Sequence, residues 1–457
     1  MEYFHLSHMN ATRITNELVL SCMLFLWALP SIAQQKEKEW PFDIRLETVE
    51  INEFPALQSF AYACWEGKWL LLGGRKDGLH RRQPWASFNE EGQNDQLYVV
   101  DPLTKQVWKQ SLQQLPAGIR EQLQSTNMEF YQIENTLVLT GGYGYSKTID
   151  NHATFPYLTI VHVEQLVTAI LKKQPIASAF VQIRDERMAI TGGRLGKLGD
   201  TLILVGGQRF DGMYNPMGPD HGPGFEQVYS NEIRKFRIAF ENNLPVIRDY
   251  HAIRDTINLH RRDYNLVPQV FQQTEAGYTV FSGVFQYDKD LPYTNFVDIN
   301  NGHYRVNNDF QQKLSHYHSA VLPLYDETTG NMHTLFFGGI ARYYPDQNGN
   351  IIANDEVPFT KTISMVTRKN EDAKESYLLV QMPGYLGAAA EFIFAPGISL
   401  YREGIAAAAD ITHSEKLIGY ITGGINSSEK NIFWTNNGKE SKAENKIIKV
   451  FLTRKNK

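Results

Sequence analysis

Cysteine is almost absent from this sequence, whose 457 residues include only Cys22 and Cys64. Cys22 lies in an apolar segment near the start that is interpreted below as a cleaved signal, so Cys64 would be left alone in the mature chain. One cysteine forms no disulfide within a chain, and a cysteine-rich metal site is excluded as well. Stability must therefore come from packing, although exported proteins commonly carry disulfides.

Clusters of one charge sign are also scarce. The chain has 45 Lys or Arg and 50 Asp or Glu, with a formal net charge of −5, and the two signs are well mixed. A nucleic-acid-binding face needs clustered Lys and Arg, so we expect no nucleic-acid partner. The short basic stretch 453–457 is interpreted as a solvated end.

No apolar run is long enough to cross a membrane. The run Leu18–Leu29 would rise too little as a helix to cross a hydrocarbon core of about 30 Å, but it has the size of a signal-peptide core. Pro30 ends it, and Ser31–Ala33 supplies the small residues of a cleavage site. We predict a signal peptide over 1–33 and a short linker over 34–41, with no membrane span after cleavage. The protein would then be exported to the periplasm, the cell surface or the medium. A buried core helix is the alternative.

Long helical patterns are rare too, while Tyr (23) and Phe (25) are abundant, which favours β-structure. One helix is expected, over 163–172, where apolar residues recur at helical spacing.

A repeated pattern dominates the rest of the chain. An apolar, strand-like run ends in a pair of small residues six times, at 73–74, 141–142, 206–207, 282–283, 338–339 and 423–424. All are Gly-Gly except Ser282-Gly283. Another short strand and a tight turn precede each run, and a loop and a third strand follow, with a fourth strand in most units. Four strands per unit are typical of a propeller blade. Glycine suits a sharp turn where neighbouring backbone is close, since it lacks a Cβ.

The first unit carries further signals after Gly73-Gly74: Asn94-Asp95, Tyr98, Asp101-Pro102 and Trp108 follow in that order. These residues stand in the kelch order, so the first unit resembles a kelch repeat most clearly. The resemblance covers roughly 42–457. Kelch units run about 50 residues, so every unit here carries insertions. The segments Gly141–Ser146 and Tyr214–Phe225 resemble exported bacterial kelch proteins of the Bacteroidota kind, which have no assigned activity. The resemblance implies a kelch-type propeller and brings no activity with it.

The ends of the array predict how the ring closes. The segment 42–51 alternates with period two, as a half-buried strand does. The last unit offers only three strands, near 404–411, 416–423 and 446–453. We therefore predict an all-β fold, a six-bladed kelch-type β-propeller over 42–457, in which the N-terminal strand completes the last blade and removes two exposed edges.

Insertions concentrate in loops that would open on one face of this propeller, and long loops on a rigid scaffold commonly carry binding sites. The inner strand of each blade would start at the same face, beside the central channel. Several of these starting segments are charged, which is costly in a narrow channel unless the groups are paired or hydrated. Interblade ion pairs are one explanation; a polar pocket for an anionic or hydroxyl-rich ligand, with Arg as a bidentate donor, is the other. The candidate ligand-binding residues are Arg75, His80, Tyr145, Arg187, Arg209, His221, Arg261, Arg262, Asp263, His318, Arg342, Arg402 and Glu403.

Other chemistries find little support. His316 and His318 would share one face of a strand and could share a metal, but such pairs more often pack by hydrogen bonding. The segment 346–350 lacks the carboxylate spacing of a calcium loop, so a hairpin turn is expected. No catalytic constellation is complete, so the catalytic residues stay unknown and neither a metal nor a cofactor is predicted.

Two functions follow from the sequence. The first is a monomeric binding or interaction module for a carbohydrate, a peptide or another polar ligand, with a glycan or a protein as partner. The alternative is a small enzyme acting on a sugar, a mutarotase or epimerase as some six-bladed kelch proteins are, which would use an Arg and a carboxylate or His as its acid–base pair.

Overall fold

The computed structural model describes residues 40–456 except 219–221, 223, 273–274 and 301–302. The predicted signal peptide and most of the predicted linker lie outside these residues, and so does His221. The following account concerns the compact unit Pro41–Lys457. In the described part of the chain, no helix is long and apolar enough to cross a membrane.

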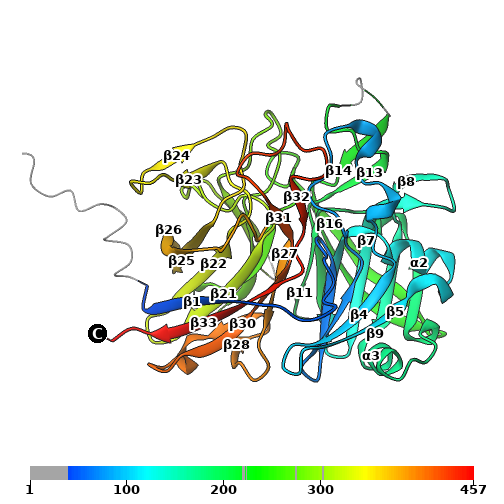
Figure 1. The fold of residues 1–457 in the computed structure, drawn as a ribbon, viewed down its shortest axis with the longest axis horizontal. Helices are drawn as coiled ribbons and strands as arrows, with labels where there is room; N and C mark the ends of the chain where they lie inside the picture. Colours follow the sequence, from blue (N-terminus) through cyan, green and yellow to red (C-terminus); the bar gives the residue numbers. More distant parts are fainter. Residues whose placement is uncertain (1–39, 219–221, 223, 273–274, 301–302, 457) are drawn as a thin grey trace, which may run out of the picture. The chain divides into compact units, whose positions relative to one another are not determined.

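Six four-stranded antiparallel units make up this part of the chain (Figure 1). Blade 1 contains β2 (Ala61–Trp65), β3 (Lys68–Leu72), β4 (Gln96–Asp101) and β5 (Gln106–Ser111). Blade 2 contains β6 (Thr126–Ile133), β7 (Thr136–Ser146), β9 (Tyr157–His162) and β10 (Phe180–Arg184). Blade 3 contains β11 (Arg194–Leu198), β12 (Thr201–Val205), β15 (Glu232–Glu241) and β16 (Leu244–Arg254). The predicted six-bladed β-propeller is confirmed; its kelch type stays a prediction.

The remaining blades follow the same order. Blade 4 contains β17 (Asn265–Val270), β18 (Ala276–Phe281), β19 (Phe296–Ile299) and β20 (Tyr304–Asn307). Blade 5 contains β21 (Ala320–Asp326), β22 (Asn331–Phe337), β25 (Thr362–Lys369) and β26 (Asp372–Gln381). Blade 6 contains β27 (Ala390–Phe394), β30 (Lys416–Gly423), β33 (Ile447–Arg454) and β1 (Phe42–Val49). The first strand of blades 1 to 5 and β27 in blade 6 are the inner strands. Successive inner strands from β2 to β27 contact one another, and the Tyr62 hydroxyl of β2 donates to the Phe392 carbonyl of β27 at 3.3 Å.

The N-terminal strand closes the ring as predicted. β1 lies antiparallel to β33 from Phe42 opposite Arg454 to Val49 opposite Ile447. The two strands run side by side in Figure 1 although they come from opposite ends of the propeller sequence. β1 therefore supplies the fourth strand of blade 6 and covers the edge of β33.

The prediction for the inner strand of blade 6 is wrong. The segment 404–411 was expected there, but β27 (Ala390–Phe394) pairs with β30 instead. The later segment forms the hairpin β28 (Leu400–Arg402) and β29 (Ile405–Ala407), and β29 pairs in parallel with β21 of blade 5. Both segments are apolar enough for a strand, so only tertiary pairing separates them.

The hydrophobic core lies between the blades. Apolar side chains of neighbouring sheets meet face to face, as in the cluster of Val267, Phe281 and Phe336 between blades 4 and 5. Across the closure, Trp69 of blade 1 and Tyr420 of blade 6 pack edge to face with ring centroids 5.0 Å apart. The predicted helix is confirmed as α3 (Val163–Leu171), and α2 (Ala117–Leu123) lies between blades 1 and 2 in sequence.

The insertions extend from the end of the propeller where the small-residue pairs lie, here called the upper face. They include β8 (Asn151–Thr154) and three hairpins: β13 (Gln208–Gly212) with β14 (Phe225–Tyr229), β23 (Tyr343–Pro345) with β24 (Ile351–Ala353), and β31 (Ile425–Ser427) with β32 (Ser441–Ala443). The three hairpins lie toward the top of Figure 1, whereas β28 lies at the bottom, on what is here called the lower face. The segment 346–350 turns between β23 and β24, as predicted.

Candidate functional site

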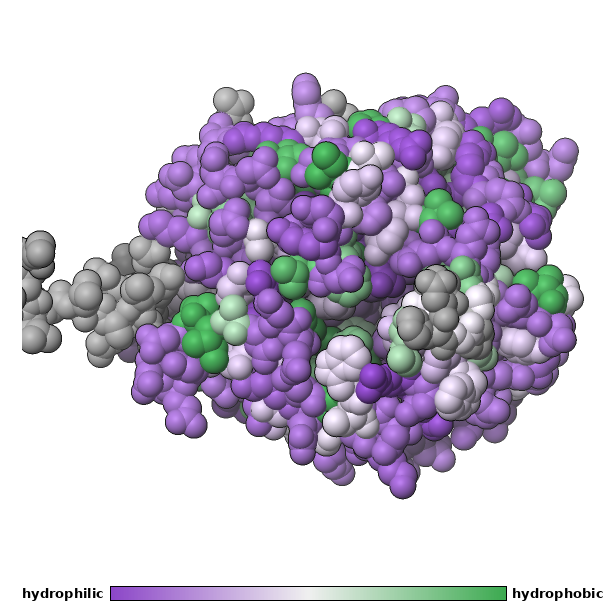
Figure 2. All heavy atoms as spheres, turned by 90° about the horizontal axis from the view of Figure 1, so that it is seen from above, coloured by the Kyte–Doolittle hydropathy of each residue, from purple (hydrophilic) through white to green (hydrophobic). Residues whose placement is uncertain are grey.

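A cavity of about 190 Å³ occupies the upper end of the central channel, here called the upper cavity. Its lining comes from the start of inner strands and from the long loops. Figure 2 looks onto this face and shows a recess near its middle, bordered by hydrophilic and apolar residues.

Arg262 and Asp263 are two adjacent charged residues in the lining of this cavity. They precede β17, and their backbone is held from both sides: the Arg262 N–H donates to the Val284 carbonyl at 2.8 Å, and the Asp263 N–H donates to the Gly192 carbonyl at 2.8 Å. The Arg262 side chain is only 13% exposed, yet its Nε makes no hydrogen bond within the described part of the chain. Its nearest carboxylate oxygen, Oδ2 of Asp263, is 3.9 Å away. A buried guanidinium with spare donor capacity is costly unless a ligand or water accepts from it.

Aromatic rings form much of the wall. His80 packs against Phe88, Tyr214 and Phe433, with centroid distances of 5.8, 4.9 and 5.7 Å. Burial lowers the pKa of His80 to about 4, so this imidazole is neutral at neutral pH. The guanidinium of Arg262 lies 5.5 Å from the ring centroid of Phe285. Rings of this kind offer flat apolar faces to a ligand.

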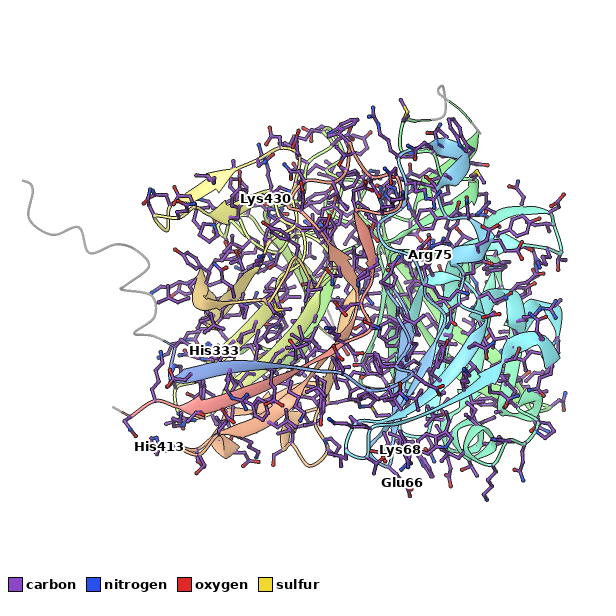
Figure 3. All side chains as sticks on the ribbon, in the orientation of Figure 1. Glu66, Lys68, Arg75, His333, His413 and Lys430 are labelled. Carbon is purple, nitrogen blue, oxygen red and sulfur yellow. The ribbon has the colours of Figure 1, made fainter. Side chains whose placement is uncertain are left out.

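Arg75 also lines the cavity and is buried, but its guanidinium is already paired. Its guanidinium donates to both carboxylate oxygens of Asp77, at 2.8 and 2.5 Å, and to the Asn89 carbonyl at 3.0 Å. Figure 3 labels Arg75 in the upper half of the propeller. Since its donors are occupied, Arg75 shapes the wall rather than offering free hydrogen bonds.

A second polar group lies deeper in the channel. Nε2 of His318 is 3.1 Å from Oε1 of Glu391, and Nη1 of Arg194 is 3.6 Å from the same oxygen. Burial lowers the pKa of His318 despite the nearby carboxylate. Burial acts to raise the pKa of Glu391, but His318 and Arg194 outweigh it and the pKa is lowered. The pair is therefore a neutral imidazole and a charged carboxylate at neutral pH.

The structure gathers five of the predicted residues at the upper cavity and places the other described ones elsewhere. Arg75, His80, Arg262, Asp263 and His318 line it. Four more residues lie outside its lining and pair with neighbouring carboxylates: Tyr145 with Asp150, Arg187 with Asp185, Arg209 with Asp211 and Glu186, and Arg342 with Asp355.

Arg402 and Glu403 are not where the sequence placed them. They were expected to begin the inner strand of blade 6 on the upper face, but they belong to the β28–β29 hairpin on the lower face. The inner strand is β27, and its Glu391 lies in the channel beside His318. The run Gly387–Ala390 before this carboxylate was the signal in the sequence, because small residues suit the crowded start of an inner strand.

Arg261 does not converge with Arg262. Its guanidinium donates to the backbone carbonyls of Asn258 at 2.6 Å, Ser282 at 2.8 Å and Asn295 at 3.1 Å. Burial lowers the pKa of Arg261 to about 10, which still leaves it charged at neutral pH. Arg261 thus ties the loops of blade 4 together and is a structural residue.

The two histidines considered for a shared metal have different partners. Nε2 of His316 bonds with the Gln312 carbonyl at 3.1 Å, and its Nδ1 accepts from the Arg342 N–H at 3.0 Å, whereas His318 faces Glu391. Among the residues that the structure describes, no group of three or more His, Cys, Asp or Glu could hold a metal ion.

Comparison with known proteins adds little to this geometry. No family model matches the chain, and no curated protein matches it. A solved structure, "Structure of YjhT", aligns with 70% of this chain and 84% of its own, with a TM-score of 0.42 and 11% sequence identity. At that level the likeness says nothing about a ligand or an activity.

Proposed function

We propose that this protein is a binding propeller whose upper cavity takes a small, hydroxyl-rich or anionic ligand, with a single sugar unit as the best-fitting class. The observation that carries this proposal is Arg262, a guanidinium that is largely buried in the cavity wall and whose Nε has no acceptor among the residues that the structure describes. Propellers commonly serve as rigid scaffolds for binding loops, and this one presents its longest loops around that cavity.

The size and chemistry of the cavity favour a small ligand over a protein segment. Its volume of about 190 Å³ is below the roughly 300–1,000 Å³ of typical drug-sized ligand pockets. Arg262 can donate to a carboxylate or a hydroxyl oxygen, while Asp263 can accept from a hydroxyl. The ring of Phe285 beside Arg262 offers an apolar face to the carbon skeleton of a sugar.

Replacing Arg262 with methionine tests this proposal. Arg262→Met keeps most of the apolar stem and removes the donors, so we expect monosaccharide affinity to fall by about 10- to 100-fold, as for a lost charged hydrogen bond. Thermal melting should stay within a few degrees. Saturation-transfer NMR with a panel of neutral and acidic monosaccharides measures the binding.

Arg342→Met is the matched control, since Arg342 also lies on an upper loop but pairs with Asp355 outside the cavity lining. It should leave affinity unchanged. Equal affinity of Arg262→Met and the unmodified protein, or a loss of stability without any change in binding, would make Arg262 a structural residue and defeat the proposal.

A catalytic role is the second candidate, and the His318–Glu391 pair favours it. A neutral imidazole close to a carboxylate can accept a proton, and His318, whose Nε2 lies 3.1 Å from Oε1 of Glu391, also lines the upper cavity. NMR exchange between sugar anomers separates the two functions: an enzyme accelerates the exchange and loses this in His318→Ala, whereas a binding module leaves the exchange rate unchanged.

The proposal includes export. A protein carrying the sequence Leu18–Ala33 should be cleaved when expressed in a host that secretes it, because the apolar core and small residues fit signal peptidase. Intact-mass spectrometry is expected to find a mature N-terminus at Gln34, free or cyclised. A mature chain that retains Leu18–Leu29 would contradict it.

A further inference from the structure

The lower end of the channel is covered by a long connection of blade 6 whose counterparts in blades 1 and 2 are short turns. In blades 1 and 2, short turns at Glu66-Gly67 and Glu134-Asn135 join the first two strands. In blade 6, residues 395–415 join β27 to β30 and include the β28–β29 hairpin. This segment is here called the strap.

The strap reaches across the channel to three other blades. β29 pairs with β21 of blade 5, placing Ala406 opposite Leu324. A Cβ on Gly404 would lie 3.1 Å from Cγ of Pro268 in blade 4. Glu403 and Tyr131 of blade 2 line the same cavity. The contacts with blades 4 and 5 and this lining shared with blade 2 place the strap under the channel, not beside it.

Above the strap lies a cavity of about 310 Å³, here called the lower chamber. Arg194, Glu391 and His318 line its inner end, and His318 also borders the upper cavity. Toward the strap it is lined by Glu403, Tyr131 and Tyr278. The rest of the lining is largely apolar or aromatic: Phe130, Leu195, Leu266, Val267, Pro268, Val321, Pro323, Phe392 and Phe394.

The charges of the lower chamber do not balance. Glu391 faces Arg194 at 3.6 Å, so these two charges compensate each other. Burial keeps His318 neutral at neutral pH. Glu403 is exposed on the strap, and no ion pair joins it to a basic side chain of the described residues. One negative charge is therefore left over, next to aromatic and apolar walls, and such surroundings attract an organic cation.

We propose that the lower chamber is a second binding site, for a small organic amine whose ammonium group lies against Glu403 and whose carbon skeleton packs on the apolar wall. This site lies toward the opposite face from the upper cavity. It is independent of the sugar-binding proposal, because its charged residues do not line the upper cavity and the neutral His318 borders both.

Three probes of matched shape and different charge test this site on the full mature chain by isothermal titration calorimetry: benzylamine, benzyl alcohol and benzoate. Benzylamine should bind, with an affinity at least about tenfold above that of the other two. Glu403→Gln should weaken benzylamine binding roughly tenfold and make it equal to benzyl alcohol. Glu66→Gln, which removes an exposed carboxylate elsewhere on the lower face (Figure 3), should leave the affinity unchanged, as should Arg262→Met.

Methyl NMR of the unmodified protein locates the bound probe without a substitution. Benzylamine should shift the resonances of Leu266 and Val267 and leave those of Ile340 and Ile425 in the upper cavity unchanged. Absence of benzylamine binding, tighter binding of benzoate, unchanged affinity in Glu403→Gln, or shifts confined to the upper cavity would each overturn the proposal. Failure of the sugar-binding test would leave these outcomes unaffected.

Discussion

Deletion of residues 42–51 is expected to lower the free energy of unfolding by at least about 5 kcal/mol and to make the protein aggregate. The deletion removes β1 with all of its pairing to β33, and it removes Phe42, Val49 and Ile51 from the interior. Each large apolar side chain contributes roughly 1.5–3 kcal/mol by its burial. The uncovered edge of β33 would then be free to pair with another chain.

Thermal melting and light scattering measure both effects on the mature protein. As a control, deletion of 346–350 removes the exposed or half-buried turn between β23 and β24 together with the Tyr377 hydrogen bond to the Gly349 carbonyl, and should cost far less. A 42–51 deletion that stays monodisperse and melts like the unmodified protein would show that β1 does not hold the ring closed.

Gly141→Ala is expected to destabilise the protein by about 3 kcal/mol or more. Gly141 has φ +64°, and a Cβ at this position would lie 1.8 Å from the carbonyl oxygen of Ile190. That carbonyl accepts the Gly142 N–H at 2.9 Å, so it cannot withdraw without breaking a contact between blades 2 and 3. The substitution therefore adds a clash with fixed backbone to the strain of a left-handed conformation.

Gly199→Ala separates these two contributions. Gly199 has nearly the same φ, +61°, but no described neighbour lies within 4 Å of its Cβ position, so only the conformational cost of about 1–2 kcal/mol is expected. Urea denaturation of both variants gives the two free energies. Equal losses would mean that close approach of the blades is not the reason for glycine at 141.

Repeated local patterns allowed the architecture to be predicted from the sequence. Each small-residue pair follows an apolar run, and the pair at 141–142 does lie where another blade's backbone comes close. The alternation over 42–51 indicated a strand with one buried face, and pairing with β33 was the simple way to satisfy it. Such features are local in sequence, and their physical requirements are the same in every blade.

Part of the candidate site could be predicted from the repetition of the blades around the channel. Arg262, Asp263 and His318 were predicted at the channel because equivalent positions of a propeller lie in one ring, and they line the upper cavity. Which of two adjacent arginines faces that cavity could not be predicted, since neighbouring residues of an extended chain point to opposite sides and a shift of one residue reverses them. Arg261 therefore binds backbone carbonyls while Arg262 lies in the cavity.

Blade 6 is the blade whose strands were only partly predicted from the sequence: β1 was predicted and the inner strand was not. The ring of six strand units and its completion by the N-terminal strand could be predicted from the sequence, because hydrophobic periodicity and the small-residue pairs act within each unit. The position of β27 as the last inner strand, the place of Glu391 beside His318 and the place of the strap under the channel followed only from the folded structure. These three features depend on contacts between residues far apart in the chain. The segment of β27 and the segment 404–411 are similarly apolar, so either could have paired with β30.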